Sequence, residues 1–174
     1  MMTRAIAIRP SAAASATTYL WAAAFVAGNI ALPQLCHMAS LGGKAFLPIL
    51  FFTLVAAARY GLACGIATAL LSPLANFALF GMPDAAMLPV VLGKSLIVAL
   101  IVGGYIQLRR TLSLGRLTML VVCCALGGLA LQTLVQGPAA AWADLVLSWP
   151  ALLIQVLGGW LVVRALPSAK PAGR

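Results

Sequence analysis

Acidic residues are almost absent from this chain, which has two aspartates, Asp84 and Asp144, against 11 Lys and Arg in 174 residues. Charged residues make up 7% of the sequence and hydrophobic residues 64%. Ordinary soluble domains carry about a quarter charged residues, so this composition excludes a soluble globule. Two acids that both fall at the rim of apolar stretches cannot form a membrane-embedded catalytic aspartate pair. We therefore expect no enzyme active site and no catalytic residues.

Residues that hold metals, cofactors or nucleotides are also scarce. His37 is the only histidine, and a catalytic zinc site needs three protein ligands, so we expect no metal site. Cys64, Cys123 and Cys124 lie inside apolar stretches, where free cysteine packs as a small hydrophobic group. The sequence has no glycine-rich phosphate loop, so we expect no ATP hydrolysis by this chain and no bound cofactor.

Six apolar stretches account for most of the sequence. A helix needs about 20 apolar residues to cross a bilayer core that is ~30 Å thick. We expect Pro33 to end the first helix, and the second is short and contains Pro48, which predicts a kink. No strand alternation typical of a membrane barrel is present. The sequence predicts an all-α fold, a single membrane domain over residues 1–174 with six transmembrane helices at about 16–32, 45–58, 62–80, 85–108, 117–136 and 143–163.

The positive charges lie on one side of these six spans. Nine of the 11 cations precede the first span, follow the last, or fall between the second and third or the fourth and fifth. Both aspartates and His37 fall on the opposite side. This positive-inside pattern predicts a multi-pass protein with both termini in the cytoplasm. The cations are spread over loop ends rather than gathered in one patch, so the net charge of +9 does not indicate nucleic-acid binding.

Polar side chains within the spans are concentrated in the outer half. Lys94 lies roughly 15 Å into the fourth predicted helix, where a lysine costs about 2.5–3.5 kcal/mol. Because both aspartates are expected too near the rim to reach it, an anionic ligand would be its natural partner. A channel would need polar lining along its whole length, so the layout favours an outward-facing pocket. The candidate binding residues are Lys94, Gln132, Gln136, Gln155, Asn76, Asn29, Gln34, His37 and Lys44.

Some of these residues have alternative roles that the sequence leaves open. Asn29 and Asn76 lie next to prolines and could satisfy backbone groups there. Lys44 could anchor the chain by extending to lipid headgroups. Ala23 and Ala27, four apart in the first span, could serve internal packing or could dock a partner membrane subunit, because small residues let helix backbones approach closely.

Residues 28–95 resemble the substrate-binding S components of energy-coupling-factor (ECF) transporters. The similar segments are GNIALPQ (28–34), KAFLP (44–48), SPLAN (72–76) and FGMP (80–83). Members of this family are small six-helix bacterial membrane proteins that capture vitamins or vitamin precursors from outside the cell. They dock on a transmembrane coupling subunit that is driven by two cytoplasmic ATPases.

The resemblance implies a protein of the bacterial inner membrane that captures a small solute, for which Lys94 indicates an anionic group. It also implies a pocket formed by the first outer loop and the outer ends of helices four to six. The face with Ala23 and Ala27 would meet the coupling subunit. The chain departs from many members in its few aromatic or charged residues in helices five and six, so the solute is not identified. The alternative function is a non-transport membrane scaffold for cell shape or envelope assembly, which needs no ligand.

Overall fold

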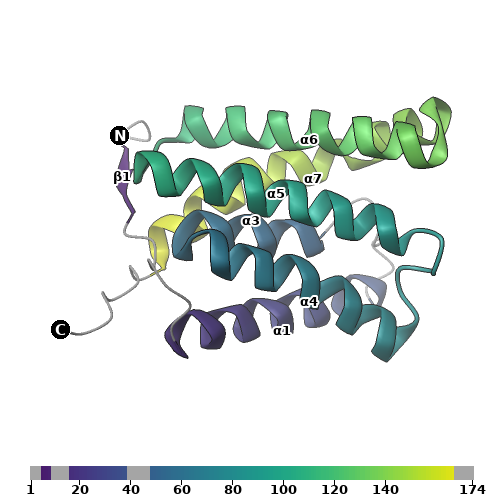
Figure 1. Ribbon diagram of the computed structural model, residues 1–174, viewed down its shortest axis with the longest axis horizontal. Helices are drawn as coiled ribbons and strands as arrows, with labels where there is room; N and C mark the ends of the chain where they lie inside the picture. The colour runs from purple at the N-terminus through teal and green to yellow at the C-terminus, as the bar shows by residue number, and fades with distance from the viewer. Residues whose placement is uncertain (1–4, 9–15, 39–47, 167–174) are drawn as a thin grey trace.

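The computed structural model is a bundle of helices with one short strand pair (Figure 1). It describes residues 5–8, 16–38 and 48–166, with the side chains of residues 17, 33–38 and 48 left out. The described elements are β1 (Ile6–Ala7), α1 (Ala16–Met38), α3 (Pro48–Tyr60), α4 (Leu62–Phe80), α5 (Leu88–Arg109), β2 (Thr111–Leu112), α6 (Leu114–Gln136) and α7 (Pro138–Ala165).

Four of the helices, α4 to α7, are long and apolar enough to cross a membrane. The apolar parts of α1 and α3, Thr18–Leu32 and Ile49–Tyr60, are shorter. Large hydrophobic side chains such as Leu108 and Leu134 are more than 80% exposed on the bundle surface, where lipid would solvate them. The structure therefore confirms an all-helical bundle compatible with a membrane. The count of six spans stays a prediction.

One prediction about a proline is wrong. The helix α1 continues to Met38 and does not end at Pro33. The described part of the second predicted helix is α3, which starts at Pro48, so the kink at this residue stays a prediction. Residues 45–47 of the predicted second helix lie outside the described residues.

The short helix α3 lies at the centre of the bundle, surrounded by α1, α4, α5 and α7 (Figure 1). Residues 54–58 are fully buried. Gly65 allows α4 to approach closely, because a Cβ atom there would lie 2.7 Å from the Cβ of Ala57. Small side chains at such contacts let helices pack backbone to backbone.

The strands β1 and β2 pair antiparallel, which the sequence did not predict. The backbone N–H of Ile8 extends the pairing by donating to the carbonyl of Arg110 at 2.8 Å, and Ile8 is buried. This contact fixes the N-terminal segment to the connection between α5 and α6.

Five of the six cations in the described residues lie at this same end of the bundle, which we call the basic end. They are Arg59, Arg109, Arg110, Arg116 and Arg164. The guanidinium of Arg59 donates to the carbonyl of Leu166, so the end of α3 is joined to the end of α7. Lys94 is the exception. The gathering of charge agrees with the predicted pattern, while the side of the membrane that the basic end faces stays a prediction.

Candidate functional site

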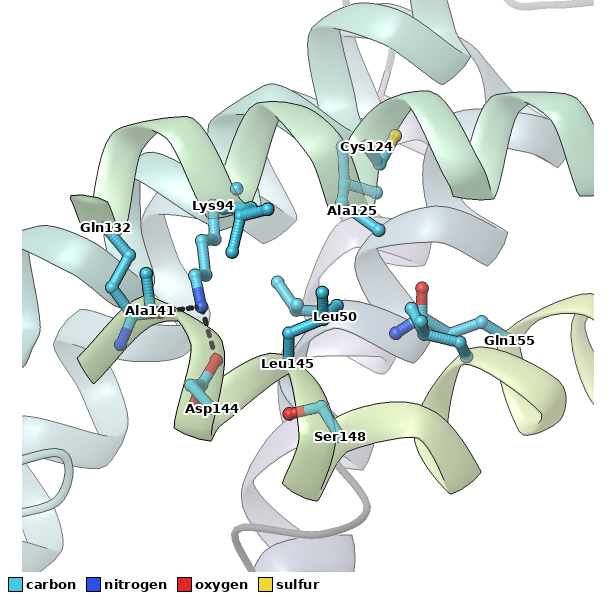
Figure 2. A pocket seen from close by; sticks show the side chains of 14 residues that line it. Leu50, Lys94, Cys124, Ala125, Gln132, Ala141, Asp144, Leu145, Ser148 and Gln155 are labelled. Carbon is cyan, nitrogen blue, oxygen red and sulfur yellow. Dashed lines mark hydrogen bonds and ion pairs between the residues drawn. The ribbon is translucent and has the colours of Figure 1, made fainter. Parts of the chain in front are cut away.

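A cavity of about 50 Å³ lies between α3, α5, α6 and α7 (Figure 2). It lies away from the basic end, since Lys94 in its lining precedes Arg109 on α5 by 15 residues. This volume holds a few water molecules, whereas small-molecule sites measure about 300–1,000 Å³. A vitamin-sized ligand would therefore need the lining helices to separate. Most lining side chains are aliphatic, and the polar ones are Lys94, Cys124, Gln132, Asp144, Ser148 and Gln155.

Lys94 is ion-paired at one end of this cavity. Its Nζ donates to Oδ2 of Asp144 at 2.6 Å and also to Oε1 of Gln132, as the dashed lines in Figure 2 show. The contact joins α5, α6 and α7. The prediction that both aspartates lie too near the rim to reach Lys94 is therefore wrong.

Two helix boundaries explain this ion pair. The helix α5 begins at Leu88 rather than at residue 85, so Lys94 lies about 9 Å from the helix start instead of roughly 15 Å. The helix α7 begins at Pro138 rather than at residue 143, so Asp144 lies about 9 Å inside its helix instead of at the rim. The two residues therefore lie equally far from the starts of their helices, and the long lysine stem spans the gap between α5 and α7.

Gln132 and Gln136 extend the polar chain that starts at Lys94. Gln132 is 2% exposed, and its Nε2 donates to Oε1 of Gln136 at 2.9 Å. The Nε2 of Gln136 in turn lies against the sulfur of Met87. Gln132 therefore lines the cavity, whereas Gln136 lies behind it and orients its amide. That either residue binds a solute stays a prediction.

Two polar atoms in the cavity lining have no hydrogen-bond partner among the described residues. These are Nε2 of Gln155 and Oγ of Ser148, whose residues are 3% and 4% exposed. The Gln155 amide nitrogen points toward Leu50 and Leu145 in Figure 2. Buried polar groups are nearly always paired, and an unpaired one costs about 1–3 kcal/mol. The two groups are therefore available to a molecule inside the cavity.

Asn29 and Asn76 lie outside the cavity lining and join α1 to α4. The Nδ2 of Asn29 donates to Oγ of Ser72 at 2.8 Å, and the Nδ2 of Asn76 donates to the backbone carbonyl of Asn29 at 3.1 Å. That carbonyl would normally accept from the N–H of residue 33, which is a proline and has none. Asn76 therefore satisfies a backbone group beside Pro33, whereas the Asn29 side chain pairs with a serine hydroxyl, and the structure does not bring these two residues to the cavity.

The remaining predicted residues are placed only in part. Lys44 and the side chains of Gln34 and His37 lie outside the described residues. Ala23 and Ala27 are exposed on α1. They therefore do not pack against the described part of the bundle, and their face is free for lipid or for a partner.

Sequence reasoning missed Asp144 and Ser148 as cavity residues. Together with Gln155 they are spaced four and seven residues apart, which places them on one face of α7. The signal that could have found them is Gly137 followed by Pro138, because proline favours the first position of a helix. Starting the helix there moves Asp144 from the rim of the predicted helix to about 9 Å inside it.

Comparisons of the chain with protein-family models, with curated proteins and with solved structures found no match. The resemblance to S components of ECF transporters therefore stays a prediction. The cavity and its side chains are the basis for a functional proposal.

Proposed function

We propose that the protein is the S component of an ECF transporter, which captures a small vitamin or vitamin precursor from outside a bacterial cell. The observation that carries this proposal is the pair of buried, unpartnered groups in the cavity, Nε2 of Gln155 and Oγ of Ser148. Among the described residues, buried unpartnered groups also occur in the packed core, at the Tyr60 hydroxyl and the Trp160 indole N–H, but those of Gln155 and Ser148 line the cavity. A bound solute would satisfy them.

The distribution of polarity supports capture rather than conduction. The half of the bundle toward the basic end holds a packed apolar core that includes Ile106, Leu117 and Val163, all with 0% exposure. A channel would need a polar path through this region. A pocket closed by an apolar plug fits a binding subunit that releases its solute only when other subunits act on it.

The helix α7 contains a bending point beside the cavity. Pro150 lies inside this helix, between Ser148 and Gln155. It removes the N–H that would bond to the carbonyl of Val146, and helices bend at such positions. We propose that bending of α7 at Pro150 enlarges the cavity when the solute binds.

The proposed partners are a membrane coupling subunit and two cytoplasmic ATPase subunits. The sequence contains no phosphate-binding loop, so the energy for uptake would come from those ATPases. The exposed face of α1 with Ala23 and Ala27 is the proposed contact with the coupling subunit. Its small side chains would let a partner helix approach closely.

Binding of water-soluble vitamins and their precursors to the purified protein in nanodiscs tests the proposal. Calorimetry should identify a solute whose affinity falls about 10- to 100-fold in Gln155→Leu, because the variant cannot donate to it. The same variant should be more heat-stable without ligand, since it removes an unpaired buried amide. Gln107→Leu is the matched control, because Gln107 is exposed near the basic end.

Two outcomes would contradict the proposal. One is the absence of any binding solute together with no uptake when coupling and ATPase subunits are co-expressed. The other is full affinity in Gln155→Leu. The first outcome would favour the scaffold alternative.

A further inference from the structure

The ion pair between Lys94 and Asp144 leaves the cavity with no net charge. Among the described residues that line the cavity, these two are the only charged side chains. Their side chains keep 14% and 26% exposure, so the pair is reachable from outside the protein rather than sealed in the core. An anionic group of a ligand can therefore replace Asp144 as the partner of Lys94, and a cationic group can replace Lys94 as the partner of Asp144.

A ligand with a single charge would unbalance this pair. An anion that binds Lys94 leaves Asp144 without a counter-charge, and a cation that binds Asp144 does the same to Lys94. Losing the counter-charge of a partly buried group is costly. A ligand with one group of each sign replaces both partners at once, so the site stays neutral.

The polar groups on α7 define the direction in which such a ligand would lie. Asp144 and Gln155 are about 16 Å apart along the helix axis. Between them the same face presents Leu145, Ser148 and Leu152 to the cavity. The unpartnered Nε2 of Gln155 is a hydrogen-bond donor at the end opposite the ion pair.

We infer that the solute is zwitterionic, with a head that inserts between Lys94 and Asp144, an apolar body and a hydrogen-bond acceptor that meets Gln155. The solute's carboxylate binds Nζ of Lys94 and its ammonium binds the Asp144 carboxylate. This inference rests on the proposed function and names the chemical class of its solute. It differs from the sequence-based expectation of a simple anion, which assumed that Lys94 had no acidic partner.

A set of compounds with one shared skeleton tests the inference. γ-Pyridylalanine has the zwitterionic head, an apolar ring and a ring nitrogen as acceptor. γ-Pyridylpropanoate lacks the ammonium, γ-pyridylethylamine lacks the carboxylate, and phenylalanine lacks the acceptor. At mildly alkaline pH, where the pyridine ring is neutral, calorimetry on the protein in nanodiscs should show γ-pyridylalanine binding at least about tenfold tighter than each of the other three.

The two single variants of the ion pair should change which compound binds most tightly, one toward the anion and the other toward the cation. Asp144→Asn leaves Lys94 as the only charge and should favour the propanoate, while Lys94→Met should favour the amine. The double variant Lys94→Asp/Asp144→Lys keeps the cavity neutral and should still prefer the zwitterion. Gln155→Leu should remove the advantage of γ-pyridylalanine over phenylalanine. Thermal unfolding of each variant shows whether it is folded.

The inference and the proposed function fail in different ways. If a vitamin or precursor binds but the wild-type protein prefers the anion, the cation or no member of this set, the zwitterion inference is overturned and the capture function stands. If neither the vitamins nor this set bind to the folded protein, both are overturned.

Discussion

The side-chain amide of Asn76 donates to the backbone carbonyl of Asn29, 47 positions earlier, at 3.1 Å. Asn29 lies four residues before Pro33, so its carbonyl has no donor within its own helix. Asn76 is 2% exposed and also donates to the carbonyl of Ser72 at 3.0 Å. The amide thus joins α1 to α4 and replaces the bond that the proline removes.

Asn76→Ala should lower the free energy of unfolding by about 1–3 kcal/mol, because it leaves the buried carbonyl of Asn29 without a donor. Pro33→Ala restores a backbone N–H four residues after Asn29 and should recover part of this loss in the double variant. Thermal unfolding in detergent measures both effects. Equal losses with proline and with alanine at position 33 would show that Asn76 acts elsewhere.

Lys94→Met and Asp144→Leu should each destabilise the unliganded protein by about 1–3 kcal/mol, because each leaves one partly buried charge without its partner. The double variant should be less destabilised than the sum of the two, since it leaves no unpaired charge. Chemical or thermal unfolding of the four proteins gives the coupling energy. Additive losses would mean that the pair contributes no stability.

The basic end should face the cytoplasm. In a variant without native cysteines, Gly115→Cys at the start of α6 should be protected from a membrane-impermeant thiol reagent in intact cells. Met82→Cys, beyond the end of α4, should react. A side chain at Gly115 meets nothing within 4 Å and Met82 is 48% exposed, so both sites tolerate the probe. Reaction at Gly115→Cys in intact cells would reverse the orientation and exclude capture from outside.

Ala23→Leu and Ala27→Leu should abolish uptake while leaving solute binding and heat stability unchanged, because both positions are exposed on α1 and a bulky residue there would hold a partner helix away. Ala140→Leu, an exposed alanine on α7, is the matched control and should transport normally. Co-purification with the coupling subunit measures docking directly. Normal uptake by both α1 variants would place the partner contact on another face.

The bounds of a helix were predictable where turn residues flank an apolar run of suitable length. The prediction for residues 62–80 matches α4 at both ends, since Gly61 and Gly81 flank an apolar run of suitable length. The start of α7 was missed because residues 138–142 contain no periodic pattern. The strands β1 and β2 have two residues each, too few for an alternating pattern to appear.

The candidate site was predictable only in part. Lys94, Gln132 and Gln155 were found because polar side chains are costly in an apolar span. In this bundle, core-facing and lipid-facing surfaces are both apolar, so the sequence does not show which face of a helix turns inward. That is why Asn29 and Asn76 could not be separated from the cavity residues in advance.

The pairing of β1 with β2 has a consequence for biosynthesis. Ile6 is translated before its partner Leu112, which follows 106 positions later. The β1 strand therefore has an unpaired edge until α1, α3, α4 and α5 have been made, and unpaired edges invite wrong associations. Residues 5–8 can complete their native contacts only after these four helices have been synthesised, so the pairing of β1 with β2 is a late step in the biosynthesis of the fold.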